Sequence, residues 1–205
     1  RHFDSALQAS LFQDGVDETL YDKILYMANE KYIDALHDYF AMKKRVLGIA
    51  EFHEYDIALD LEPAFDVSYT IEQCADILKK ALAPLGEDYT ALLQKAFDER
   101  WIDFYPAADK RTGAYSWGTY DSNPYILTNF TGSYDSLSTL AHELGHSMHS
   151  YFSNQHNRPM LAGYQIFVAE VASTVNELLL SDYLLKTADD DAYRRYILSN
   201  LMEQF

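Results

Sequence analysis

The sequence has little cysteine and no long hydrophobic run. Its single cysteine, Cys74, excludes an internal disulfide and any cysteine-based zinc cluster, and it favours a reducing compartment. No apolar run reaches the ~20 residues that a membrane-spanning helix needs, and the first residues lack the charged and apolar regions of a signal peptide. We therefore expect a cytoplasmic protein with no membrane partner.

Basic residues are also scarce. The chain has 16 Lys and Arg against 32 Asp and Glu, which gives a net charge of -16. Such a field repels nucleic acid and anionic lipid, so we expect no nucleic-acid partner, and neutral or cationic ligands, metal ions included, are favoured. The simpler interpretation is that the acidic surface only maintains solubility.

The composition is otherwise that of a globular protein. Hydrophobic residues make up 48% and charged residues 23% of 205 residues, and a chain of this size can bury roughly 70% of its unfolded surface. No repeat, low-complexity segment or long Gly/Pro linker divides it. Helical patterns run abruptly into both ends, so we expect residues 1–205 to be a single segment that is truncated at both ends.

Apolar residues recur at helical spacing over most of the chain. Thr70 and Gln73 form a potential capping box, and Gly48 is a typical helix stop. Asp135 or Ser136 could cap the helix that carries the sharpest motif. The expected helices cover residues 3–12, 17–47 (one helix or two in succession), a segment from 70, 87–100, 135 to about 152, 164–186 and 193–205.

Four short segments change to a period near two, which is typical of strands. They are residues 55–61, 101–105, 114–117 and 124–130. The sequence therefore predicts a mainly α fold with a small antiparallel β-sheet. An exposed edge at Gly113, Ala114, Tyr115 and Ser116 could bind an extended peptide; the alternative is a purely structural hairpin.

The motif with the clearest chemistry is His142-Glu143-Leu144-Gly145-His146. Residues four apart on a helix share a face, with Cβ atoms about 6 Å apart, so His142 and His146 can reach one zinc ion. Glu143 lies about 100° around the helix from His142. It can contact a metal-activated water without occupying a coordination position, as a general base for hydrolysis must.

A catalytic zinc site generally needs a third protein ligand and an open position. Residues 147–169 contain no Asp or Glu, so Glu170 is the first carboxylate after the motif. Glu170 belongs to a stripe of polar residues at helical spacing on an otherwise apolar helix, which we interpret as an inward face that lines the site. The stripe consists of Glu170, Ser173, Thr174, Glu177 and Ser181.

His149 lies on the same helix face as His142 but about 10.5 Å along the axis. One ion cannot bind both side chains. His149 is therefore either a group that orients ligands or contacts substrate, or simply a packed histidine.

Three segments carry a family resemblance. Residues 139–151 (TLAHELGHSMHSY), 166–177 (IFVAEVASTVNE) and 110–130 (KRTGAYSWGTYDSNPYILTNF) closely resemble the oligoendopeptidase F group within the thimet oligopeptidase family of zinc peptidases. The likeness extends over essentially the whole chain. It implies a multi-helical, zincin-type catalytic region, with His142, His146 and Glu170 as ligands of one Zn²⁺ per chain and Glu143 as the catalytic glutamate.

The resemblance also implies a substrate and missing parts. Family members are zinc-dependent endopeptidases that admit short unfolded peptides to a deep channel and exclude folded proteins. Full-length relatives have a helical region before this segment and, after it, His and Tyr residues that contact the substrate carbonyl. We therefore expect the remaining regions of the full-length enzyme to be partners of this segment, and the isolated segment to be weak or inactive.

Two other functions are compatible with the motif. In a structural zinc-binding helical domain, a fourth protein ligand such as Glu177, two turns beyond Glu170, would close the coordination shell. In a helical interaction module, the motif would be accidental and would retain no stoichiometric zinc.

Overall fold

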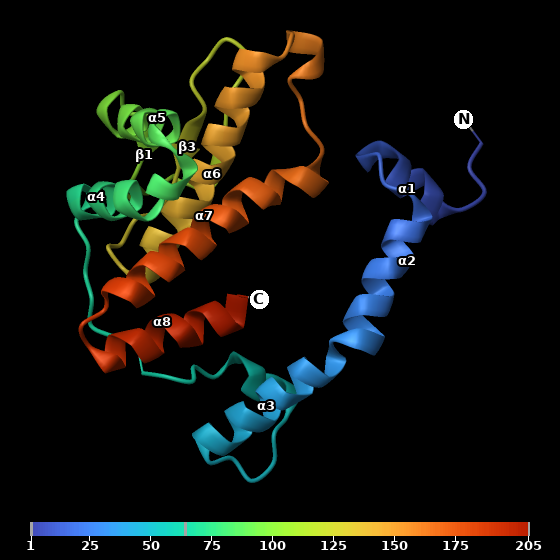
Figure 1. The fold of residues 1–205 in the computed structure, drawn as a ribbon, viewed down its shortest axis with the longest axis vertical. Coiled ribbons are helices and arrows are strands. Elements are labelled where there is room, and N and C mark those ends of the chain that lie inside the picture. The colour runs from blue at the N-terminus through green and yellow to red at the C-terminus, as the bar shows by residue number, and fades with distance from the viewer. Residues whose placement is uncertain (1, 64, 205) are drawn as a thin grey trace. The chain divides into compact units, whose positions relative to one another are not determined.

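The computed structural model describes residues 2–63 and 65–204 (Figure 1). The chain forms two compact units, Arg1–Pro63 and Ala64–Phe205. That both units belong to one truncated domain segment stays a prediction.

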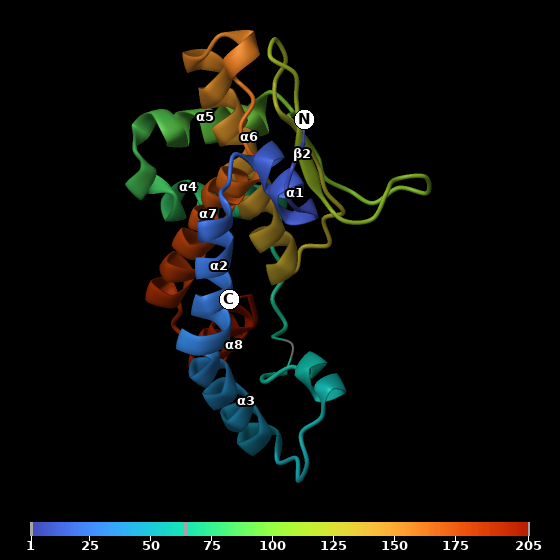
Figure 2. The same ribbon diagram turned by 90° about the vertical axis from the view of Figure 1, so that its right-hand side faces the viewer.

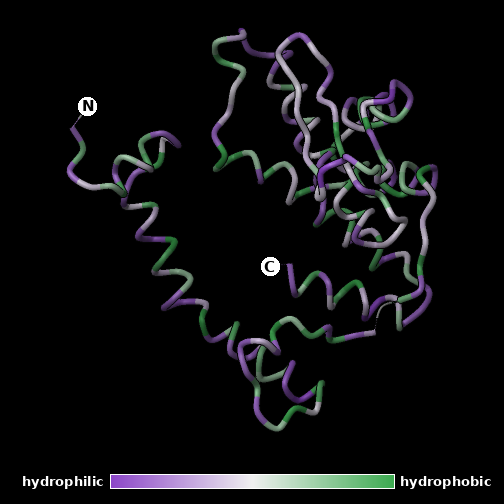
Figure 3. The backbone as a smooth tube through the Cα atoms, turned by 180° about the vertical axis from the view of Figure 1, so that it is seen from behind, coloured by the Kyte–Doolittle hydropathy of each residue, from purple (hydrophilic) through white to green (hydrophobic). Residues whose placement is uncertain are grey.

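The first unit is built from helices. They are α1 (Ala6–Asp14), α2 (Glu18–Tyr26), the π-helical turn η1 (Met27–Lys31) and α3 (Ile33–Leu47). The expected helix over residues 17–47 is thus two α-helices in succession, and Gly48 ends α3 with a φ of 66° as predicted. Hydrophilic and hydrophobic residues alternate along α2 and α3 (Figure 3), which is typical of amphipathic helices.

The strand expected over residues 55–61 is wrong. The structure has a 3₁₀ helix there, η2 (Glu54–Ala58). The side chain of Asp56 accepts a hydrogen bond from the backbone N–H of His53 at 2.8 Å, and Lys43 Nζ donates to the carbonyl of Ile57 at 2.8 Å. The backbone around this 3₁₀ helix thus forms hydrogen bonds with side chains, which compete with strand pairing.

The second unit contains the other helices and the sheet. The helices are α4 (Ile71–Ala81), α5 (Glu87–Asp98), α6 (Tyr134–His156), α7 (Ile166–Thr187) and α8 (Asp191–Gln204), with the short 3₁₀ turns η3 (Ala83–Leu85) and η4 (Pro159–Leu161). The predicted capping box of α4 is present, because Thr70 and Gln73 exchange both hydrogen bonds. The cap of α6 is Ser133 instead of Asp135 or Ser136: its Oγ accepts the backbone N–H of Ser136 at 3.1 Å.

The sheet consists of β1 (Ile102–Asp103), β2 (Tyr115–Trp117) and β3 (Tyr125–Leu127) in the order β1-β3-β2. The mainly α class with a small sheet is confirmed, but the sheet is mixed. Strands β2 and β3 are antiparallel, whereas β1 and β3 are parallel. The long segment between β1 and β3, which contains β2, gives the chain room for the crossover that a parallel pair needs.

The core of this unit lies between α6, α7 and their neighbours. Helices α6 and α7 pack along each other (Figure 1), and the sheet lies along one side of α6 (Figure 2). One face of α6 buries Leu137, Leu140, Leu144 and Met148 completely, and each such side chain contributes about 1.5–3 kcal/mol. That packing fixes the orientation of α6 and therefore the direction in which its opposite, polar face points. Within 2–63 and 65–204, no helix combines the length and apolarity needed to cross a bilayer.

Candidate metal centre

Two imidazoles project from one face of α6. His142 and His146 are one turn apart, and their Nε2 atoms lie 3.1 Å from each other. The rings are nearly perpendicular, at 81°. Since the opposite face of α6 is buried in the core, both rings point away from that core, and they contact acidic residues of α7.

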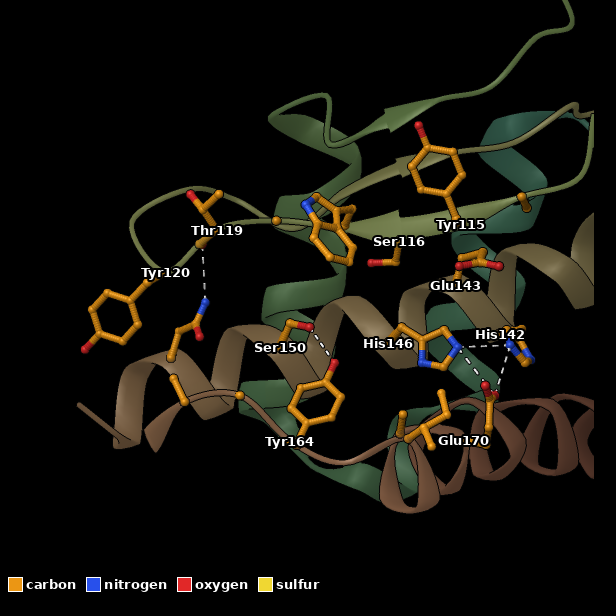
Figure 4. Close-up of a pocket in the computed structure, with 18 of the residues that line it drawn as sticks. Tyr115, Ser116, Thr119, Tyr120, His142, Glu143, His146, Ser150, Tyr164 and Glu170 are labelled. Atoms are coloured by element: carbon orange, nitrogen blue, oxygen red, sulfur yellow. Dashed lines mark hydrogen bonds and ion pairs between the residues drawn. The ribbon is translucent and has the colours of Figure 1, made fainter. Parts of the chain in front are cut away.

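Glu170 approaches the same point from α7. Its Oε2 lies 3.4 Å from His142 Nε2 and 3.5 Å from His146 Nε2 (Figure 4). Tetrahedral zinc, with bonds of ~2.0–2.1 Å, holds its ligand atoms about 3.3 Å apart. The three atoms are therefore spaced as ligands of one ion would be, and these residues could hold a metal.

The carboxylate of Glu170 is held in this direction by its own helix. Ser173, one turn further along α7, donates from Oγ to Glu170 Oε2 at 2.8 Å. Ser173 is fully buried, whereas the side chain of Glu170 is 53% exposed. The carboxylate thus has a fixed hydrogen-bond donor on one side and an open cavity on the other.

Glu177 contacts the other nitrogen of His142. Its Oε2 lies 3.1 Å from His142 Nδ1, and this hydrogen bond raises the pKa of His142, although burial opposes it. An Nδ1–H that donates to a carboxylate leaves the lone pair of Nε2 free for a metal. Glu177 therefore lies behind a potential ligand instead of occupying a fourth coordination position, which argues against a closed structural zinc site.

His146 differs from His142 in its surroundings. Burial lowers the pKa of His146, and the neighbouring His142 acts in the same direction. The neutral imidazole is thus favoured, and the neutral form is the one that binds a metal.

Glu143 lies on the β2 side of the two histidines (Figure 4). Its residue is 6% exposed, and its Oε2 is buried without a hydrogen-bond partner in the part of the chain that the structure describes. Burial raises the pKa of Glu143, while His142 opposes that shift. A buried carboxylate oxygen with no partner, beside a potential metal site, is placed to accept a proton.

A cavity opens over these groups. Its volume is about 680 Å³, within the range of roughly 300–1,000 Å³ that is usual for ligand pockets. His142, Glu143, His146 and Glu170 all line it. The side of the three potential ligands that faces the cavity is therefore open to water and substrate.

His149 lies outside this group. Its ring stacks on Tyr164, with centroids 3.8 Å apart and planes 14° from parallel. Its Nδ1 is buried without a partner in the described residues, and burial lowers its pKa. His149 is thus packed behind a cavity residue and does not line the cavity itself.

The expected peptide-binding edge lies partly at the cavity. Ala114, Tyr115 and Ser116 line it. Within the residues that the structure describes, β2 pairs with β3 alone, so it is an edge strand. Gly113 lies before the strand and outside this cavity, where its carbonyl accepts a hydrogen bond from Asn129 Nδ2 at 2.9 Å. Of the four predicted residues, Gly113 is therefore the one that does not line the cavity.

Sequence reasoning missed two residues that hold α6 against α7. A Cβ on Gly145 would lie 2.6 Å from Ser173 Cα, so only glycine permits this approach. Asn176 is fully buried; its Nδ2 donates to the carbonyl of Ala141 and its Oδ1 accepts from Tyr89 Oη. The glycine inside a helix was a signal, since glycine there costs roughly 1 kcal/mol; Asn176 gave none.

Comparisons with known proteins place the chain in a family. The model of peptidase family M3 matches residues 1–205. The chain is 42% identical over 205 residues to the oligopeptidase PepF of Bacillus subtilis (strain 168), of which it covers 30%. It is 40% identical over 206 residues to the chromosomal oligoendopeptidase F of Lactococcus lactis subsp. cremoris, of which it covers 34%. Each match includes 100% of this chain, which thus spans about a third of the length of these relatives.

Solved structures share the fold of this chain. A crystal structure of a protein from Chlamydophila abortus superposes with a TM-score of 0.88 at 39% identity, over 99% of this chain and 34% of that one. Oligoendopeptidase-F from Enterococcus faecium superposes with a TM-score of 0.65 at 29% identity, over 100% of this chain and 28% of that one.

Proposed function

The chain belongs to peptidase family M3, a family of metallopeptidases, and from that premise we propose that it is the metal-binding part of a zinc-dependent oligoendopeptidase. Its substrates would be short unfolded peptides. His142, His146 and Glu170 would hold one Zn²⁺, and Glu143 would be the general base.

One observation carries this proposal. Three potential ligand atoms from two helices meet within 3.5 Å of one another, and a buried carboxylate with an unpartnered oxygen lies beside them at an open cavity. Two imidazoles and one carboxylate with an open position form the donor set of zinc hydrolases. The residues present therefore fit the metal.

A bound zinc ion would supply a Lewis acid for the scissile carbonyl and would make a water molecule more acidic. Glu143 would accept the proton of the attacking water at Oε2 and return it to the leaving nitrogen. Because burial raises the pKa of Glu143, its carboxylate is a stronger base for the proton of the attacking water than an exposed glutamate would be. Glu177 would keep the His142 ring in its ligating orientation.

The free edge of β2 would bind the peptide. An extended substrate could pair with the backbone of this strand, which gives affinity with little dependence on sequence. Further regions of a polypeptide as long as the relatives would supply donors to the substrate carbonyl, and the loss of one such donor costs about 10²–10³ in rate. We therefore expect the 205-residue chain alone to hydrolyse peptides weakly.

The test uses quenched fluorescent peptides with the complete enzyme and with residues 1–205. We expect chelator to abolish hydrolysis and zinc to restore it. Glu143→Gln should retain stoichiometric zinc and lose hydrolysis by at least about 10²-fold, whereas the exposed control Glu87→Gln should keep its rate. Unchanged turnover in Glu143→Gln would reject Glu143 as the base, and chelator-resistant turnover would reject the metal.

A further inference from the structure

The cavity extends well beyond the potential metal ligands. Its floor is a stripe on α6 in which every fourth residue lines the cavity: His142, His146, Ser150 and Asn154. Residues four apart share one helix face. The groove past His146, at Ser150 and Asn154, is therefore continuous with the proposed reaction centre.

Two contacts along the groove show in which direction β2 runs relative to α6. Ser116 Oγ lies 2.8 Å from Ser147 Oγ, and further along both segments Tyr120 Oη donates to the carbonyl of Asn157 at 2.8 Å. Strand β2 and the loop after it thus run in the same direction as α6. A peptide paired antiparallel to β2, the slightly more stable arrangement, would have its amino end towards Asn154. The groove would then receive residues on the amino side of the scissile bond.

Tyr164 forms a fixed wall of this groove. It lies in the loop before α7, lines the cavity, and faces Ser150 in Figure 4. Its ring stacks on His149 at 3.8 Å, and its Oη lies 2.6 Å from Ser150 Oγ. Two residues of α6 thus hold the phenol before any ligand arrives, so little conformational entropy is lost when a side chain packs on it.

Trp117 borders the same cavity from β2. Its residue is 74% exposed, although Trp side chains gain much from burial. None of the residues that line the cavity in the described chain is Lys or Arg, and two of them, Glu143 and Glu170, are acidic. The groove thus offers aromatic surface and negative charge, which suits a neutral aromatic side chain and disfavours an acidic one.

We propose that Tyr164 and Trp117 determine substrate specificity by binding an aromatic side chain of the residue on the amino side of the scissile bond. This inference rests on the proposed function, whose site it extends. Contact with this aromatic surface should favour an aromatic over an alanine side chain at this position by about 10- to 100-fold in kcat/KM.

The experiment measures hydrolysis by the complete enzyme of peptides that differ from one another at one position. One set has Phe, Ala or Asp on the amino side of the scissile bond, and a second set has the same three residues on its carboxyl side. We expect the Phe-to-Ala ratio of kcat/KM on the amino side to fall at least about 5-fold in Tyr164→Ala and in Trp117→Ala. Tyr164→Phe, which keeps the ring, should retain the ratio. The control Tyr105→Ala removes an exposed phenol outside the cavity.

A second readout does not depend on turnover. In the Glu143→Gln enzyme, the ratio of the Kd values for the Phe and Ala peptides should show the same loss in each variant. The inference would be overturned if the Phe-to-Ala ratio stayed constant in both alanine variants, or if kcat/KM fell equally for all peptides. A preference for Phe on the carboxyl side instead of the amino side would also overturn it. Absence of chelator-sensitive hydrolysis in the wild type would instead reject the proposed function, and the Kd ratios would still decide whether the groove binds aromatic side chains.

Discussion

At the residue scale, the candidate site shows which roles can be predicted from spacing. The positions of His142 and His146 follow from helical periodicity alone, and Glu170 follows from the absence of any earlier carboxylate after the motif. The support from Ser173 Oγ to Glu170 Oε2 could not be predicted. It depends on a side-chain rotamer, and rotamers are selected by tertiary packing around α7 instead of by sequence spacing.

Glu177 allows a test at this scale. Its carboxylate lies 3.1 Å from His142 Nδ1, so Glu177→Ala removes the group that orients the ring and favours the Nδ1–H form. We expect zinc affinity to fall about 10- to 100-fold, and Glu177→Gln, which keeps an acceptor, to lose less. Competition with a chelator of known affinity measures both changes.

The matched control is Asp182→Ala, which removes an exposed acid from the same helix. It should leave zinc affinity unchanged. A loss in Asp182→Ala as large as that in Glu177→Ala would show that general acidity of α7, and not the contact with His142, governs affinity.

At the scale of elements, helix ends were predictable where a cap is encoded locally. Thr70 and Gln73 begin α4 as expected, and Gly48 ends α3. The conformation of the segment 55–61 could not be predicted, because its alternating pattern carries no information about the side-chain bonds that Asp56 and Lys43 form with the backbone there. The parallel pairing of β1 with β3 likewise depends on a crossover that strand patterns do not specify.

The contact between α6 and α7 gives a prediction for Gly145→Ala. The added methyl group would lie 2.6 Å from Ser173 Cα and 2.8 Å from the carbonyl oxygen of Ala172, so α7 must shift. Overpacking of this kind costs about 1–3 kcal/mol, which the better helix propensity of alanine, roughly 1 kcal/mol, does not fully offset. Because Glu170 lies one turn before Ser173, zinc affinity should also fall.

Denaturant unfolding and chelator competition measure the two effects. Gly163→Ala is the matched control, since a Cβ there meets no atom within 4 Å. If Gly145→Ala kept both stability and zinc affinity at the level of Gly163→Ala, the close approach of the helices would not be required for the site.

At the scale of the whole molecule, the sequence contained no sign of the division into Arg1–Pro63 and Ala64–Phe205. No glycine- or proline-rich linker marks the boundary. The division arises from contacts between residues that are distant in the sequence, and local composition contains no information about such contacts. All residues of the proposed metal site lie in the second unit.

Because the proposed metal site lies in the second unit, we expect zinc to stabilise that unit against unfolding. Both tryptophans of the chain, Trp101 and Trp117, belong to the second unit, so tryptophan fluorescence reports that unit. Zinc at 100 times its Kd should stabilise the folded unit by about 2.7 kcal/mol, which corresponds to a rise in Tm of roughly 5 to 10 °C for a chain of this size. Thermal unfolding of residues 1–205, followed by fluorescence with zinc and with chelator, measures the shift. His146→Ala should abolish the shift because it removes one of three ligand groups, and an equal shift in that variant would show that zinc stabilises the chain elsewhere.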